Sequence, residues 1–110
     1  MAAIANLFID QGSTFSTSVN VKNDDETAFD LTNHTAAAQI RKSYSSSTAT
    51  DFTTATVSAT DGTCTITLTD TVTSALDEGR YVWDLITTDG SGIKTRRIEG
   101  RATVTPSVTR

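Results

Sequence analysis

Apolar and polar residues alternate with a period of two along most of this sequence, and this pattern restricts the possible folds more than any other feature. The clearest case is the segment 63–69, in which Cys64, Ile66 and Leu68 alternate with four threonines. Because successive side chains of a β-strand point to opposite faces, such a segment predicts a strand with one buried face. Thr and Ser together make up roughly a third of the chain, and β-branched threonine suits the exposed face of a strand. An all-β protein is therefore expected.

Turn signals divide the sequence into seven or eight short strands. The expected strands span 6–9, 14–21, 29–32, 35–41, 52–59, 63–69, 80–88 and 94–105. Between two of them, Asp61-Gly62 predicts a tight hairpin turn with Gly62 at positive φ. The segment 70–76 has helical spacing instead, and it predicts one helical turn with Asp70 as its N-cap. These elements predict an immunoglobulin-like antiparallel β-sandwich, with a small barrel as the alternative.

The length of 110 residues fits a single domain over 1–110, in which residues 1–10 form a docking arm or an edge strand. Hydrophobic residues make up only 36% of the chain, so the core should be thin. The side chains expected to point into it are Phe15, Val19, Ile40, Ile66, Leu68, Trp83 and Val104. A thin core would gain stability from contact with other subunits.

The net charge of −4 argues against nucleic-acid and anionic-membrane partners, which favour a basic face. One cysteine excludes an intrachain disulfide. The N-terminus lacks the basic start and apolar run of a signal peptide, and no stretch approaches the length of a membrane span. We therefore expect assembly in a reducing cytoplasm.

Residues that could carry chemistry are few, and a structural role suits each of them better. His34 is the single histidine, so a catalytic triad would have to include it. A metal site with several histidines is excluded. Cys64 alternates in phase with apolar residues and is expected to be a small buried side chain. The acidic run 24–26 does not have the alternate spacing of a Ca²⁺ loop, and the glycines of 89–92 indicate a tight turn. No catalytic residue, metal, cofactor or small-molecule substrate is expected, and the protein is predicted not to be an enzyme.

Tyr81 and Trp83 lie two residues apart on one strand face, where exposed aromatic rings could stack on a sugar or a base. Because Leu85 continues the same face, burial in the core is the favoured interpretation. A glycan site could also use Tyr44 and its neighbouring serines.

Charge is unevenly distributed, and the segment 94–110 carries five basic residues against one acidic residue. A basic strand on an acidic domain suits contact with copies of itself or with another subunit; alternatively, its arginines neutralise carboxylates of the same chain. Asp84, between apolar neighbours, should need a partner among Arg80, Arg96 and Arg97. The apolar segment 6–9 could pair with an open strand edge of a neighbour. The expected interface residues are Leu7, Phe8, Lys94, Arg96, Arg97, Arg101 and Arg110.

Three short motifs lie on the expected strands in a characteristic order. Gln39-Ile40-Arg41 lies on an early strand, Leu76-Asp77-Glu78-Gly79-Arg80-Tyr81-Val82-Trp83-Asp84 enters a late strand, and Gly100-Arg101-Ala102-Thr103-Val104-Thr105-Pro106 ends the last one. This order resembles small bacteriophage structural proteins and the immunoglobulin-like N-terminal domain of phage baseplate upper proteins. The resemblance covers most of the chain from Gln11 onward.

The resemblance implies a docking module without catalytic residues, which joins a larger virion assembly. The chain ends directly after its last strand, with no coiled coil or receptor-binding domain, so a distal host-recognition role is not expected. The expected function is that of a virion structural protein of the tail, baseplate or neck, which binds other virion proteins and copies of itself. A head decoration protein is the first alternative, and a host-glycan-binding module is the second.

Overall fold

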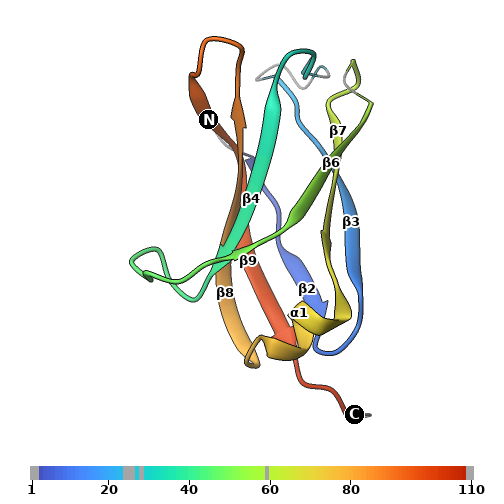
Figure 1. The fold of residues 1–110 in the computed structure, drawn as a ribbon, viewed down its shortest axis with the longest axis vertical. Coiled ribbons are helices and arrows are strands. Elements are labelled where there is room, and N and C mark those ends of the chain that lie inside the picture. Colours follow the sequence, from blue (N-terminus) through green and yellow to red (C-terminus); the bar gives the residue numbers. More distant parts are fainter. Residues whose placement is uncertain (1–2, 24–26, 28, 59, 109–110) are drawn as a thin grey trace.

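The computed structural model describes residues 3–23, 27, 29–58 and 60–108, which form two β-sheets packed face to face (Figure 1). The elements are β1 (Ala3–Ile4), β2 (Leu7–Asp10), β3 (Phe15–Asn20), β4 (Thr35–Arg41), β5 (Thr50–Asp51), β6 (Thr53–Ser58), β7 (Thr63–Leu68), α1 (Asp70–Ala75), β8 (Gly79–Thr88) and β9 (Lys94–Thr105). One sheet has the order β1-β9-β8-β4-β5, with β2 also paired to β9, and the other has the order β3-β7-β6. This arrangement is that of an immunoglobulin-like sandwich, so the predicted fold is confirmed.

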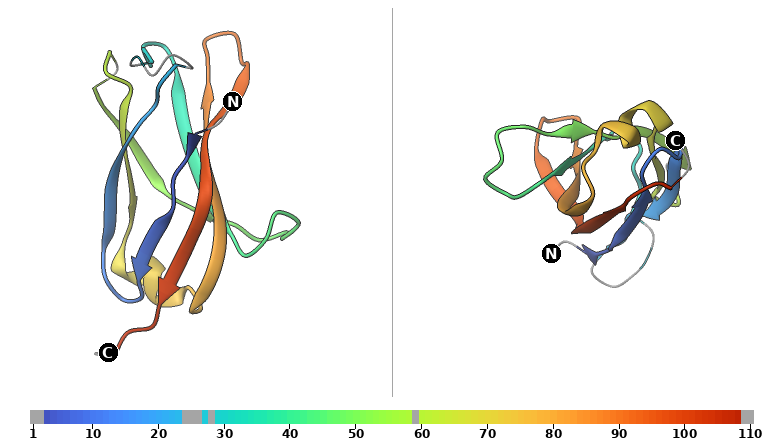
Figure 2. Two further views of the ribbon diagram at one scale, coloured as in Figure 1. Left: turned by 180° about the vertical axis from the view of Figure 1, so that it is seen from behind. Right: turned by 90° about the horizontal axis from the view of Figure 1, so that it is seen from below.

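The sequence predicted a purely antiparallel sandwich, and in this respect the prediction is wrong. β1 and β2 both pair with β9 in parallel. The views in Figures 1 and 2 show why: β2 runs toward the end of the sandwich that holds α1, and β9 runs to the same end. From there the chain turns and crosses to β3 in the other sheet. The N-terminal segment thus adds to the edge of the six-stranded sheet within its own domain.

The expected single strand 52–59 is instead part of a segment that changes sheets. β5 pairs with β4 in the six-stranded sheet, whereas β6 pairs with β7 in the three-stranded sheet. Phe52 lies at the crossing point, where its N–H donates to the Ala38 carbonyl at 2.9 Å and its ring is buried. A strand that switches sheets in this way closes a corner of the sandwich.

The return strand expected at 29–32 does not form, and the chain makes a turn there. The Asp30 carboxylate accepts hydrogen bonds from the Thr32 hydroxyl at 2.5 Å and from the Thr32 N–H at 2.8 Å, and these bonds lower the pKa of Asp30. The His34 N–H donates to the Leu31 carbonyl at 2.9 Å. Asn33 has a φ of 65°. Side chains of Asp and Asn stabilise such turns by bonding to the backbone or by tolerating positive φ, and here they override the apolar pattern.

The helical turn expected at 70–76 forms as α1, but Asp70 is not its N-cap. Thr69 is the cap, and its hydroxyl accepts the N–H of Val72 at 3.4 Å, while Asp70 occupies the first turn. Beyond the helix, the Tyr81 hydroxyl donates to the Asp77 carbonyl at 2.8 Å. This contact has the form of the tyrosine corner of immunoglobulin-like domains, and it holds the segment before β8 against the start of that strand.

The turn 89–92 between β8 and β9 confirms the interpretation of its glycines as turn residues. The Asp89 carboxylate accepts the N–H groups of Ser91 at 2.8 Å and Ile93 at 2.9 Å, and Gly92 has a φ of 85°. These hydrogen bonds stabilise the ionised form, so the pKa of Asp89 is lowered.

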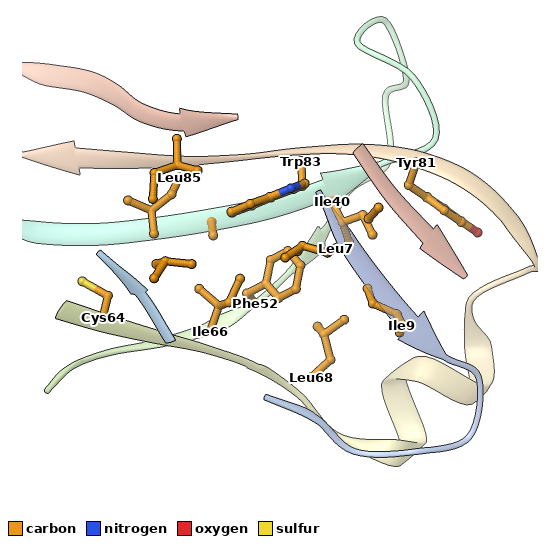
Figure 3. Packing of buried hydrophobic residues seen from close by; sticks show 14 of the residues in the cluster. Leu7, Ile9, Ile40, Phe52, Cys64, Ile66, Leu68, Tyr81, Trp83 and Leu85 are labelled. Atoms are coloured by element: carbon orange, nitrogen blue, oxygen red, sulfur yellow. The ribbon is translucent and has the colours of Figure 1, made fainter. Parts of the chain in front are cut away.

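Both sheets contribute to one core, shown in Figure 3. Six of the seven predicted core residues are buried, and the seventh, Phe15, is half-buried against the core. Phe52 is central to the aromatic packing, because its ring centre lies 6.1 Å from that of Trp83 and 6.2 Å from that of Phe15. The alternating pattern therefore predicted the inward face correctly.

Candidate docking surface

The outer face of the six-stranded sheet is the surface that positions most of the predicted interface residues. In β8 the odd-numbered residues from Tyr81 to Thr87 are buried, so the even-numbered residues face outward. Register then aligns charged side chains across the strands: Asp84 lies between Gln39 of β4 and Glu99 of β9, and Val82 lies between Arg41 and Arg101. This face therefore carries an acidic row next to a basic row.

A β-bulge in β9 decides where Arg96 points. Ile98 lies opposite Leu85 and is buried, and strict alternation would turn Arg96 inward as well. The register shifts between Leu85 and Ile86, so Arg96 lies opposite Ile86 on the outer face. There its guanidinium forms ion pairs with Asp84 at 3.3 Å and Glu99 at 3.4 Å. Of the three arginines predicted as partners of Asp84, Arg96 forms the ion pair. This arginine therefore neutralises carboxylates of its own chain.

Arg97 is also engaged within the domain. Its guanidinium lies 4.0 Å from the centre of the Phe29 ring, and its Nε donates to the Thr87 hydroxyl at 3.0 Å. Thr87 is buried, so the bulge turns Arg97 toward the interior end of the sandwich. Arg96 and Arg97 are adjacent in the sequence, which suggested a single basic patch. The structure separates their side chains, so they do not form one.

Lys94 and Arg101 are the predicted basic residues that remain available. Both are exposed, and neither forms an ion pair with another residue that the structure describes. The backbone N–H of Arg101 donates to the Asn6 side-chain oxygen at 3.1 Å, which holds the residue beside the N-terminal segment. Arg110 lies outside the described residues.

The two apolar residues predicted for the interface point in opposite directions. Leu7 and Ile9 are buried in the core, so Leu7 is not available to a partner. Phe8 faces outward with 73% of its surface exposed, and Ile4, which the sequence interpretation did not select, is 79% exposed. Ile4 and Phe8 are four residues apart, so both side chains lie on the same, outer face of the sheet. This spacing was the signal that could have identified Ile4.

The aromatic residues considered for glycan binding also differ in exposure. Tyr81 and Trp83 are buried, as the core interpretation predicted, and they cannot form an exposed platform. Tyr44 is 73% exposed on the loop that projects between β4 and β5 (Figure 1). It borders a pocket of about 130 Å³ whose other polar side chains are Gln39, Arg41, Asp84 and Arg96.

Hydrogen bonds hold that projecting loop against the sheet. Arg41 donates to the Ser46 carbonyl at 2.7 Å and to the Gln39 side-chain oxygen at 3.1 Å, and the Gln39 amide donates to Asp51 at 2.7 Å. The chain of contacts fixes Arg41 and Gln39 on the outer face and positions the loop that carries Tyr44.

The side chains considered for chemistry have structural surroundings. His34 packs edge-on against the Phe29 ring, with ring centres 5.2 Å apart, and its Nδ1 lies 3.0 Å from the Thr32 carbonyl oxygen. No group of three or more metal-ligating side chains occurs among the residues that the structure describes, and the acidic run 24–26 lies outside them. The six-residue α1, the one helix in the described part of the chain, is too short to span a membrane.

Cys64 is fully buried, and burial raises the pKa of its thiol because the charged thiolate is poorly solvated there. We expect the thiol of the folded protein to react with a soluble disulfide reagent far more slowly than the same thiol in denaturant, since the thiolate is the reactive species. Absorbance of the released thiol, with and without denaturant, measures the ratio. Equal rates in the two conditions would contradict the burial of Cys64.

Comparisons with known proteins add little to this surface. No protein-family model matches the chain, and no curated protein sequence is similar to it. A search of solved structures finds an internalin-like protein of Listeria monocytogenes with 18% sequence identity and a TM-score of 0.46. The similarity covers 96% of this chain but 28% of that protein, so the chain spans less than a third of its length.

Proposed function

We propose that the protein is a non-enzymatic structural subunit of a bacteriophage virion, an immunoglobulin-like module that docks onto other virion subunits of the tail, baseplate or neck. The observation that carries the docking part is the outer edge of the six-stranded sheet, where Ile4 and Phe8 are largely exposed. Large apolar side chains that a domain leaves to solvent at one place are typical of a protein-binding surface.

The virion part of the proposal rests on the sequence resemblance to phage structural proteins. The three motifs that carry it fall on neighbouring strands of one sheet, namely β4, β8 and β9. Their members include the core residue Trp83 and the outer-face residues Arg41 and Arg101. The resemblance therefore extends to the sheet that carries the proposed docking surface.

Electrostatics supports contact with an acidic surface on a neighbouring subunit. Lys94 and Arg101 are exposed cations without an ion-pair partner among the described residues. Replacement of both by serine should reduce the amount of protein incorporated into purified particles, and added salt should weaken incorporation of the unchanged protein. Quantitative mass spectrometry of gradient-purified particles measures both effects.

Lys22 supplies the matched control, because it is an exposed cation on the connection after β3, away from the outer face. Serine at this position should leave incorporation unchanged. Arg96 and Arg97 are unsuitable for the same test, since their loss would disturb contacts within the domain. Absence of the unchanged protein from all particles would overturn the proposal as a whole, whereas normal incorporation of the Lys94 and Arg101 variant would remove its electrostatic part.

A second candidate function, glycan binding, is favoured by the position of Tyr44 beside a small polar pocket. An exposed aromatic ring next to amide, guanidinium and carboxylate groups can stack on a sugar and bond its hydroxyls. The variant Tyr44→Ala distinguishes the two proposed functions. Docking predicts normal particles that bind host cells normally, whereas glycan binding predicts normal particles with weakened binding to host cells.

A further inference from the structure

The two sheets end in four edges, and three of them are protected against pairing. β5 is only two residues long, and β6 carries a register shift between Thr56 and Ser58. β3 turns polar side chains outward, and Ser16 and Asn20 bond across to β7. Short strands, bulges and polar side chains are the usual means by which proteins block edge-to-edge association.

The fourth edge is formed by β1 and β2, and its β2 part has no bulge and carries a large exposed apolar side chain, Phe8. The register of β2 against β9 is regular over all four residues, and the segment 3–10 contains no Lys and no Pro. Ile4 and Phe8 are exposed on it, and no described strand pairs with its outer side (Figure 2). Of the edges that the structure describes, this one is open to another strand.

The hydrogen-bond pattern shows which backbone groups of this edge are free to pair. The N–H groups of Ala5 and Gln11 donate to the β9 carbonyls of Glu99 and Thr105, both at 2.9 Å. In a parallel ladder only alternate residues bond to a given neighbour. The odd-numbered positions therefore bond to β9, and the N–H and C=O groups of Phe8 and the N–H group of Asp10 point toward the open side. The C=O group of Asp10 instead accepts the Ser13 N–H at 3.1 Å.

We propose that this edge binds the same edge of a second copy of the protein, with the two β2 strands antiparallel and Phe8 on the two-fold axis. In this register Phe8 lies opposite the partner's Phe8, and Asn6 lies opposite the partner's Asp10. Two aromatic rings thus meet at the axis, where cross-strand pairs of this kind stabilise a sheet. A shift that placed Asp10 opposite the partner's Asp10 would bring two carboxylates together, so charge disfavours it.

Charge complementarity is the argument for a second copy rather than another strand. Arg101 is adjacent to Asn6, faces the same side of the sheet as Asp10, and has no ion-pair partner among the described residues. The Asp10 carboxylate accepts a hydrogen bond from the Thr105 hydroxyl at 2.8 Å. With Phe8 on the axis, the partner's Asp10 reaches across Asn6 to Arg101. The symmetry repeats this ion pair, so one edge supplies both halves of a self-complementary interface.

This inference deepens the proposed function, since it names the contact between copies of the docking module. The two can fail separately: particles could incorporate a monomer, and a dimer could exist without any particle. The test therefore uses the isolated chain, and its readout is the mass measured by sedimentation equilibrium over a range of concentrations.

The unchanged protein should show a concentration-dependent dimer. Phe8→Asp should weaken the dimer by roughly tenfold to a hundredfold, because two carboxylates would face each other at the axis. Val57→Asp is the matched control, since Val57 is 64% exposed on the β6 edge and its replacement should leave the dimer unchanged. A chain that stays monomeric at all concentrations, or equal effects of the two variants, would overturn the proposal.

Charge reversal tests the register. Asp10→Arg and Arg101→Asp should each weaken the dimer at low salt, and the double variant should restore it because the pair is re-formed with opposite sense. Circular dichroism of each variant shows whether the fold is retained. A double variant that is weaker than both single variants would contradict the Asp10–Arg101 pair and the proposed register.

Discussion

Replacement of Gly100 by alanine is expected to lower the free energy of unfolding by about 3 kcal/mol, because the new methyl group would occupy space taken by another backbone segment. An added Cβ would lie 1.8 Å from the Ala5 carbonyl oxygen and 3.2 Å from the Trp83 indole nitrogen. That oxygen accepts the indole N–H of Trp83 at 2.9 Å, and the Ala5 N–H donates to Glu99. Relief of the clash requires the N-terminal segment to move off β9, which breaks these bonds and leaves a buried indole N–H without its partner.

Gly90 provides the control for this variant. A Cβ at Gly90 would meet nothing within 4 Å, so Gly90→Ala should change stability by less than about 0.5 kcal/mol. Urea titration followed by Trp83 fluorescence measures both variants, and displacement of the N-terminal segment should also shift the emission of folded Gly100→Ala to longer wavelength. Equal stability of the two variants would show that the N-terminal segment does not lie against Gly100.

Replacement of Gly62 by alanine should have a similar effect, at least about 3 kcal/mol, for two reasons that add. Gly62 has a φ of 68°, which confirms the prediction made from Asp61-Gly62, and an L-residue is strained there. A Cβ would also lie 2.5 Å from the carbonyl oxygens of both Val21 and Phe29. These atoms belong to backbone that is tied to the turn, since the Val21 N–H donates to the Gly62 carbonyl at 2.8 Å and the Phe29 N–H donates to Val21 at 3.0 Å.

Gly92→Ala separates the two reasons, because Gly92 has a φ of 85° but open space around the position of a Cβ. This control should lose only about 1 kcal/mol, the cost of the backbone strain alone. The difference between the two variants in chemical denaturation then measures the clash with Val21 and Phe29. If both variants lost the same stability, the close approach of these carbonyls would be wrong.

Alternation of side chains was enough to predict most of the strands and their buried faces. β8 and β9 begin and end within a residue of the expected limits, and Trp83, Leu68 and Val104 are buried as the pattern required. It failed where local polar groups compete with a strand, as in the turn that Asp30 and Asn33 stabilise. It was also uninformative for the N-terminal segment, because Leu7, Phe8 and Ile9 are all apolar and their order does not indicate which face is buried.

The candidate surface depended more on contacts between distant parts of the chain. Arg96 and Arg97 are neighbours in the sequence, and only the bulge opposite Leu85 and Ile86 sends one to Asp84 and the other to Phe29. The basic segment was visible in the composition, whereas its division into engaged and available cations was not.

The sequence by itself determined the strand content, the direction of most core side chains and the positive φ of Gly62, because these follow from the pleat of a strand and the geometry of a turn. The tertiary structure alone decided which strands pair, in which direction and in which register. It placed the Ala5 carbonyl over Gly100 and left Ile4 and Phe8 on an open edge. The physical reason is that side-chain alternation is a property of neighbouring residues, whereas strand pairing depends on contacts such as that of Trp83 with Ala5, made between residues far apart in the chain.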